Sequence, residues 1–299
     1  MWSIDFRNGF FYNRKNITMN IRNKTNRYLS AVVALFTLCL SCQKMERPAL
    51  GDYPKDANPP GGPLKFYAAL DGGNVDSIRA NFGVAEKAAY EPGVNGMAYK
   101  GSTDSYIKYT SANDFANVTS FTISFWLKKN GPPAAGAGTQ WAFGLPTNTD
   151  IWHRHEMCMF FEDANNPSTA DSVAMKMILQ DQFIEFVGAR RIPKLFNNQW
   201  HHVAVVYSEA SSKLATYIDG VQQYATISSV TDIKKGGNPR GKLTFTNVSG
   251  FVIGGPGHYA IGKTPDDWMH NFDGSLDQFR LYGTALSAAE ITALYNSKL

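Results

Sequence analysis

The chain has 299 residues, of which 43% are hydrophobic and 18% are charged, and its formal net charge is +4. This apolar content excludes a disordered chain, because enough side-chain surface can be buried to offset the entropy lost on folding. Three cysteines are too few for a miniprotein held together by disulfides. The length allows one large domain or two ordinary ones.

The excess positive charge lies in the first 42 residues. They contain six basic residues and one acidic residue, whereas the rest of the chain contains 23 basic and 24 acidic residues. The net charge is therefore +5 in the first segment and −1 in the remainder. A protein that binds nucleic acid needs a basic surface to displace counterions, so we predict no nucleic-acid partner.

Residues 1–41 have the pattern of a secretory signal. Basic residues precede an apolar run at 28–40, which is shorter than a bilayer-spanning helix, and Ser41 and Cys42 follow it. A cysteine after a small residue resembles a bacterial lipoprotein signal, in which Cys42 is acylated and becomes the mature N-terminus. Met19 can begin a complete signal by itself. An ordinary N-terminal helix, or a signal that does not use Cys42, is the alternative.

Residues 42–63 are predicted to form a tether. Five prolines and three glycines in this stretch disfavour both helix and sheet and favour an extended spacer. The residues directly after Cys42 faintly resemble the tags that send some lipoproteins to the outer face of the outer membrane. We therefore expect a chain that is lipid-anchored in the outer membrane, faces the cell exterior and contacts the membrane only through its anchor.

The segment 64–299 has the pattern of a β-sandwich. Residues 120–127 alternate apolar and polar side chains, and residues 200–207 are rich in β-branched and aromatic residues. Asp219 and Gly220 form a strong hairpin signal between two further strands. The remaining strand candidates are 64–70, 105–109, 141–145, 157–161, 173–179, 183–187, 214–218, 221–224, 242–246, 251–253 and 275–282. Such short strands predict an all-β sandwich of two antiparallel sheets.

One helix is expected near the C-terminus. Ser287 and Glu290 have the spacing of a capping box and precede apolar residues at 291, 294 and 295. The prediction for 64–299 is thus a single all-β domain closed by one short helix.

Several segments occur in an order that is typical of one family. They are Leu70-Asp71-Gly72, residues 96–99, residues 120–126, residues 200–207, Tyr217-Ile218-Asp219-Gly220, Ile253-Gly254-Gly255, residues 272–277 and residues 285–287. Together they resemble the laminin-G-like branch of the concanavalin A-like lectin/glucanase superfamily, over residues 64–299. The resemblance implies a jelly roll whose concave face or loop rim often binds carbohydrate. The same fold hosts glycan binders, protein binders and glycosidases, so it does not decide the function.

The residues argue against catalysis. Retaining glucanases of this superfamily carry Glu-x-Asp-x-x-Glu on one strand, and no glutamate after Cys42 has an aspartate two positions later. Glu162 and Asp163 are adjacent, so on a strand they would point to opposite faces. Cys158 lies in an apolar run typical of a buried, unreactive thiol. We therefore predict that the chain is not an enzyme, with a hydrolase or lyase as the disfavoured alternative.

Glycan binding needs exposed aromatic faces with polar groups nearby, and two tryptophans lie in polar segments. Trp152 is followed by His153, Arg154 and His155, and Trp268 lies in a second polar segment. Tyr259 precedes that second segment. We predict that these six residues form a carbohydrate-binding site; alternatively, either tryptophan plugs an edge of the sandwich from a long loop.

Asp71 and Asp273 are candidate metal ligands. The resemblance implies Ca²⁺ near the sheet ends, and these two residues could meet if the first and last strands pair. Calcium takes six to eight oxygens, of which the sequence suggests only this pair, and both residues fit equally well as turn formers before glycine.

These features together predict a lipid-anchored protein that binds polysaccharide or oligosaccharide as part of a glycan-capture system. Its expected partners are a glycan and outer-membrane glycan-import proteins. The alternative is an adhesion or assembly module that binds protein through the same fold.

Overall fold

The computed structural model describes residues 61–299 except 133–137, 150, 163–167, 246 and 299. The signal, Cys42 and most of the tether lie outside the described residues. Within the described part, no helix has the length and apolar character needed to cross a bilayer.

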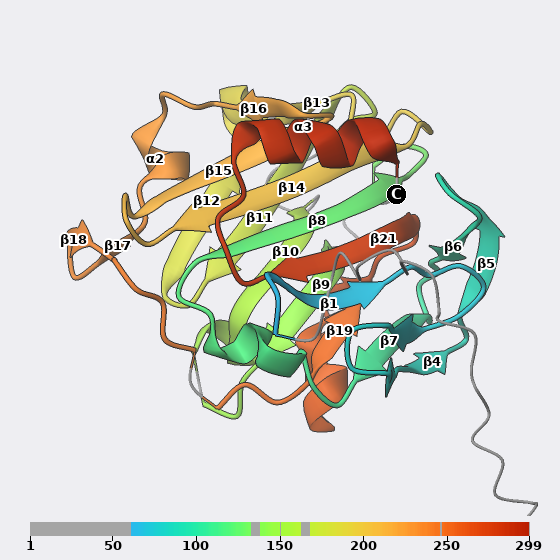
Figure 1. The fold of residues 1–299 in the computed structure, drawn as a ribbon. Coiled ribbons are helices and arrows are strands. Elements are labelled where there is room, and N and C mark those ends of the chain that lie inside the picture. The colour runs from blue at the N-terminus through green and yellow to red at the C-terminus, as the bar shows by residue number, and fades with distance from the viewer. Residues whose placement is uncertain (1–60, 133–137, 150, 163–167, 246, 299) are drawn as a thin grey trace, which may run out of the picture. The chain divides into compact units, whose positions relative to one another are not determined.

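Two large sheets make up the domain (Figure 1). The strands of the first, called sheet A, follow the order β16, β15, β14, β8, β21, β1, β2, β3, and β6 joins β21 while β5 joins β6. Their bounds are Val221–Gln223, Lys213–Ile218, His201–Ser208, Phe121–Lys128, Ser275–Tyr282, Leu64–Ala68, Val75–Asp76 and Asn81–Phe82 for the ordered strands, Met97–Lys100 for β6 and Ala89–Pro92 for β5.

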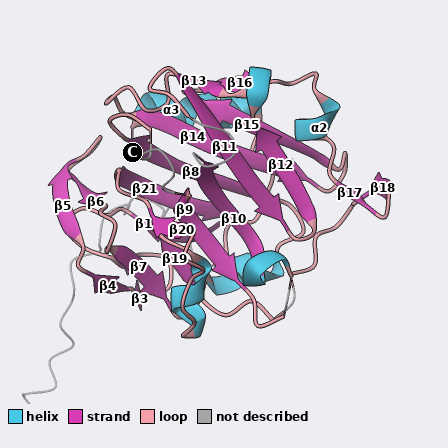
Figure 2. Ribbon diagram, turned by 180° about the vertical axis from the view of Figure 1, so that it is seen from behind, coloured by secondary structure: helices cyan, strands magenta, loops and turns pink. Residues whose placement is uncertain are grey.

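The second sheet, called sheet B, lies behind the first and faces the viewer in Figure 2. Its order is β12, β11, β10, β9, β19, β7, β4, with β13 added to β11 and β20 added to β9. Their bounds are Gln182–Phe186, Ser172–Leu179, His155–Glu162, Thr139–Pro146, Phe251–Ile253, Tyr106–Tyr109 and Val84–Glu86, then Ile192–Pro193 for β13 and Met269–Asn271 for β20. Among the described strand pairs, only β20 with β9 is parallel.

Short elements connect the strands. A two-stranded ribbon is formed by β17 (Lys234–Lys235) and β18 (Asn238–Pro239). The helices are α2 (Ser228–Thr231) and α3 (Ala288–Ser297), and the 3₁₀ turns are η1 (Asn113–Asn117), η2 (Trp152–Arg154), η3 (Gly188–Arg190) and η4 (Gly257–Ile261).

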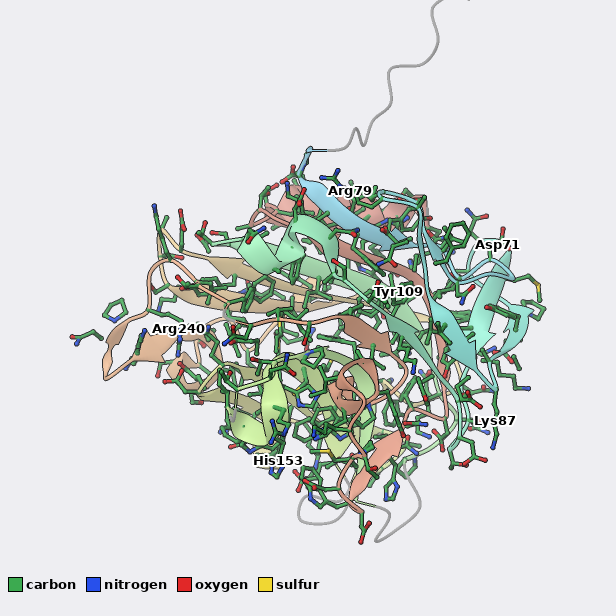
Figure 3. All side chains as sticks on the ribbon, turned by 90° about the horizontal axis from the view of Figure 1, so that it is seen from below. Asp71, Arg79, Lys87, Tyr109, His153 and Arg240 are labelled. Atoms are coloured by element: carbon green, nitrogen blue, oxygen red, sulfur yellow. The ribbon has the colours of Figure 1, made fainter. Side chains whose placement is uncertain are left out.

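The core fills the space between the sheets. Phe125 of sheet A packs against Phe143 of sheet B, with ring centroids 6.1 Å apart, and is stacked on Phe279 at 5.0 Å. At another level Phe66 of sheet A meets Tyr109 of sheet B edge-on at 4.9 Å, and Figure 3 shows Tyr109 between the layers. Because every second residue of a strand points inward, one apolar set from each sheet suffices to build this core.

Helix α3 covers the outer face of sheet A. Ile291 is buried against Ala204 and Val206 of β14, and Tyr295 stacks on Trp126 of β8 at 5.7 Å. The outer face of sheet A is therefore partly closed by the end of the chain.

The all-β sandwich with one C-terminal helix is confirmed. Asp219 and Gly220 both have positive φ in the β15–β16 hairpin, as predicted. The side chain and backbone of Ser287 exchange hydrogen bonds with Glu290 in a complete capping box. The prediction of a strand at 242–246 was wrong, because the described part of this segment is irregular. Leu243 is nevertheless buried, and its amide donates a hydrogen bond to the Thr119 carbonyl.

Candidate functional site

The outer face of sheet B, turned away from the core, carries one row of side chains across five strands. In this row Glu185 lies opposite Lys176, Lys176 opposite Phe160, Phe160 opposite Trp141, and Trp141 opposite Asn271. Neighbouring residues on β10 and β11 point into the core, so strand alternation places this row outside it. The row runs through β12, β11, β10, β9 and β20, which lie side by side in Figure 2.

Trp152 of η2 lies flat over the middle of this row. Its ring is 5.6 Å from Phe160 at an interplanar angle of 10°, and 5.9 Å from Trp141 at 14°. Phe183, which is 41% exposed, meets the same indole edge-on at 5.1 Å. One face of Trp152 therefore rests on the sheet, and the side chain is only partly buried.

Trp268 lies beside Trp152, on the segment that leads into β20. The two indoles are 6.1 Å apart, and the ring of His153 meets Trp268 edge-on at 5.0 Å. The carbonyl of Trp268 accepts a hydrogen bond from the amide of Thr139, which fixes this segment to β9. We call Trp152, Trp268 and Phe183 the aromatic platform, which rests on Trp141 and Phe160.

The loops that carry the two tryptophans are tied together. Nδ1 of His153 lies 2.8 Å from a carboxylate oxygen of Asp266, and these side chains are 39% and 48% exposed. His153 and Arg154 both adopt left-handed backbone conformations, with φ of 41° and 62°. Such conformations cost of order 1 kcal/mol each for side chains of this type. The backbone conformation that places Trp152 over the sheet is therefore locally unfavourable and is stabilised by the surrounding contacts.

Charged groups border the platform at the β11–β12 end. The ammonium of Lys176 lies 2.5 Å from Glu162 and 2.9 Å from Glu185. Burial alone would lower the pKa of Lys176, but its hydrogen bonds with Glu162 and Glu185 outweigh this effect and raise the pKa above its ordinary value. The lysine is thus held charged between two carboxylates.

His155 does not belong to the exposed site, contrary to our expectation. It is completely buried, its Nδ1 donates to the carbonyl of His153 at 2.7 Å, and its Nε2 accepts from the amide of Gly257 at 2.8 Å. Burial lowers its pKa to about 3, so the ring is neutral at physiological pH. We infer that His155 fastens η4 to sheet B, because both of its nitrogens are already bonded.

The other two predicted residues, Arg154 and Tyr259, make contacts outside the three platform rings. Arg154 donates to the carbonyl of Asn148 at 3.4 Å. Tyr259 stacks on Tyr106 at 3.8 Å with parallel rings, and its hydroxyl is hydrogen-bonded to Asn271. Tyr259 therefore contacts the β20 end of the row, at Asn271.

Asp71 and Asp273 do not form a calcium site by themselves. Strands β1 and β21 do pair, as that prediction required, but Asp71 accepts the amide of Met97 at 2.8 Å and Asp273 is ion-paired with Lys129. Across the described residues no group of three or more His, Cys, Asp or Glu side chains could hold a metal. Asp71 also lies well away from His153 (Figure 3). The calcium prediction is not supported by these contacts and stays a prediction.

The sequence did not identify Lys176, Glu185, Phe160 and Phe183 as members of the site. The alternation of residues within the predicted strands indicates that these side chains share a face. The sequence does not show which strands are neighbours or in which register they pair. Cys158 is buried in the same sheet, and burial raises the pKa of its thiol, which confirms the expected unreactive side chain.

Solved structures with this fold include proteins whose descriptions name a carbohydrate or glycolipid ligand. Domain 4 of a GH43 extracellular arabinanase from Geobacillus stearothermophilus, in complex with arabinotriose, matches 78% of this chain and 98% of its own, with 18% identity and a TM-score of 0.50. A structure of botulinum neurotoxin type C, whose cell entry is described as dependent on interaction with two ganglioside molecules, matches 81% of this chain and 53% of its own. The identity is 15% and the TM-score is 0.53. A Trypanosoma rangeli sialidase in complex with 2,3-difluorosialic acid matches 79% of this chain and 33% of its own, with 17% identity and a TM-score of 0.52. At these identities the likeness shows the fold alone.

These structures correct one prediction. We expected a chain that is not an enzyme, but the arabinanase and the sialidase are enzymes, so this fold occurs in enzymes as well as in other proteins. The prediction is wrong as stated, because the missing Glu-x-Asp-x-x-Glu motif excludes one arrangement of carboxylates rather than catalysis in general.

The family assignment comes from sequence comparison. No curated protein matches this chain significantly. A laminin G profile, described as concanavalin A-like lectin/glucanases superfamily, matches residues 101–292, which is more than half of the chain and spans both sheets. The chain belongs to the concanavalin A-like lectin/glucanases superfamily.

Proposed function

We propose that this chain binds polysaccharide or oligosaccharide on the outer face of sheet B, at the aromatic platform. The observation that carries the proposal is the position of Trp152, which lies parallel to Phe160 and Trp141 on the outer face of the sheet and stays partly exposed there. A sugar ring has an apolar face that stacks on such an indole, and Glu185 of the adjoining row, which is 41% exposed, can accept hydrogen bonds from its hydroxyls.

The fixed geometry of the platform supports this role. Trp152 and Trp268 come from separate loops, yet the contact of His153 with Asp266 and the edge-on contact of His153 with Trp268 hold them together. A site that is already formed loses little conformational entropy when a ligand binds. The arabinotriose complex of the arabinanase domain agrees with glycan recognition on this fold, without indicating the sugar recognised here.

A glycan array followed by calorimetry tests the proposal. We expect Trp152→Ala and Trp268→Ala each to weaken binding by at least tenfold, which corresponds to about 1.4 kcal/mol. The matched control is Phe82→Ala, because Phe82 is an aromatic residue that is 72% exposed on β3, in sheet A. Thermal unfolding checks that each variant is folded.

Two outcomes would contradict the proposal. One is undiminished binding in both tryptophan variants, which would place the site elsewhere. The other is a chain that binds no glycan and instead captures a protein, which would favour the adhesion or assembly alternative.

We further propose that Cys42 is acylated and anchors the chain in the outer membrane, facing outward, where it would deliver glycans to import proteins. The support is the sequence pattern alone: a basic and apolar signal, Ser41-Cys42 and a Pro-rich tether. Metabolic labelling with a fatty-acid analogue should label the wild type and Cys39→Ala but not Cys42→Ala. Label that persists in Cys42→Ala would refute the anchor.

A further inference from the structure

We propose that the ligand of the aromatic platform is a neutral glycan rather than one that carries carboxylates, an inference that rests on the proposed function. The structural relatives leave this open, since arabinotriose is neutral whereas gangliosides and sialic acid are anionic. The charges around the platform decide between the two classes.

The cation closest to the Phe160 side of the platform is already compensated. Lys176 contacts carboxylates on both sides, Glu162 at 2.5 Å and Glu185 at 2.9 Å, and its own side chain is 14% exposed. A ligand carboxylate could bind Lys176 only by displacing one of these glutamates. The lysine therefore offers its surroundings no unpaired positive charge, and the glutamates leave an excess of one negative charge.

The Trp268 side of the platform is also acidic. Asp266 and Asp267 are both exposed on the segment that precedes Trp268, and His153 contacts only the first of them. Arg154 supplies one permanent cation here, and its guanidinium is directed to the Asn148 carbonyl. Across the row, the adjacent Glu162 and the segments 151–154 and 265–268, four carboxylates face two permanent cations, which are Lys176 and Arg154.

This excess acts on the ligand through the local potential. Charges within about one Debye length, about 8 Å at physiological ionic strength, are incompletely screened, so an added carboxylate is repelled. Neutral hydroxyls experience no such repulsion, and the partly exposed carboxylates of Glu185 and Asp266 can accept the hydrogen bonds that hydroxyls donate. The platform thus matches a neutral sugar in both its apolar and its polar parts.

Matched polymers test the inference with the full chain. Linear arabinan, a β-glucan and a mannan are each compared with their own carboxymethylated form, and sialylated oligosaccharides with their desialylated forms. We expect the neutral member of the pair that binds to bind at least tenfold more tightly at low salt. The ratio should shrink as salt is added, because the repulsion is screened.

Charge reversal provides the control. Asp267→Lys should narrow the ratio of neutral to anionic binding at least threefold, whereas Asp114→Lys, an equal change on η1 beside Arg79, should leave it unaltered. Equal or tighter binding of the anionic member would overturn the inference and leave the proposed function intact. Absence of binding to every polymer and oligosaccharide would overturn the proposed function, and the inference with it.

Discussion

Asp277 of β21 provides a quantitative test of how the outer face of sheet A is held. Its carboxylate is fully buried; one oxygen accepts the amide of Val94 at 2.7 Å, and the other has no hydrogen-bond partner among the described residues. Burial raises the pKa of Asp277 from 3.8 to about 6, although the bound amides act in the opposite direction. A shift of about two units corresponds to about 3 kcal/mol.

The sign of the effect follows from proton binding. The folded state holds the proton more tightly than the unfolded state, so this group stabilises the fold below pH 3.8 and that stabilisation is lost as pH rises through 6. Asp277→Asn cannot ionise and keeps an oxygen for the Val94 amide. Its free energy of unfolding relative to wild type should therefore rise by about 1.5 kcal/mol between pH 5 and pH 8.

Urea unfolding at four pH values, followed by tryptophan fluorescence, measures this difference. Asp232→Asn is the control, because a hydrogen bond from Lys213 lowers the pKa of Asp232 and its carboxylate stays ionised over the same range. Its difference from wild type should be constant. A constant or falling difference for Asp277→Asn would refute the claim that burial dominates at this carboxylate.

Three further predictions concern separate contacts. Ser287→Ala removes the capping box of α3 and should lower stability by about 1 kcal/mol, measured by thermal unfolding; an unchanged Tm would contradict it. His153→Ala and Asp266→Ala should each weaken glycan binding. The double variant should bind little more weakly than either single variant, because both substitutions remove the same contact between His153 and Asp266; additive losses of binding free energy in calorimetry would show independent roles. If Asp71 and Asp273 bind Ca²⁺ as predicted, Ca²⁺ added to chelator-treated protein should raise Tm and Asp71→Ala should abolish the rise; an unchanged Tm of the wild type would refute the calcium site.

The strands and the closing helix were predictable because their signals are local. Alternation along 120–127 indicates which side chains enter the core between the sheets, namely Phe121, Ile123, Phe125 and Leu127. The paired positive φ values at Asp219 and Gly220 follow from residue types that tolerate them. The error at 242–246 has a physical reason. Leu243 and Phe245 alternate with polar residues as in a strand. Their side chains pack against the domain, with Phe245 stacked on Phe115 at 6.2 Å, but the backbone of the described part of this segment does not pair with a neighbouring strand.

The site was only half visible for a related reason. Trp152 and Trp268 stood out as aromatic residues in polar segments, and the structure brings them together at 6.1 Å. Lys176 and Glu185 become neighbours only through the register of β11 and β12, which no local pattern encodes. His155 was misplaced because it adjoins the same polar segment yet begins β10, where it is buried.

The structure of a complex with the glycan that binds most tightly tests the central claim most directly. We predict that a sugar ring lies against the outward face of Trp152, above Phe160 and Trp141, with Trp268 at its side. A glycan bound instead on the α3 side of sheet A, with Trp152 uncovered, would contradict the account.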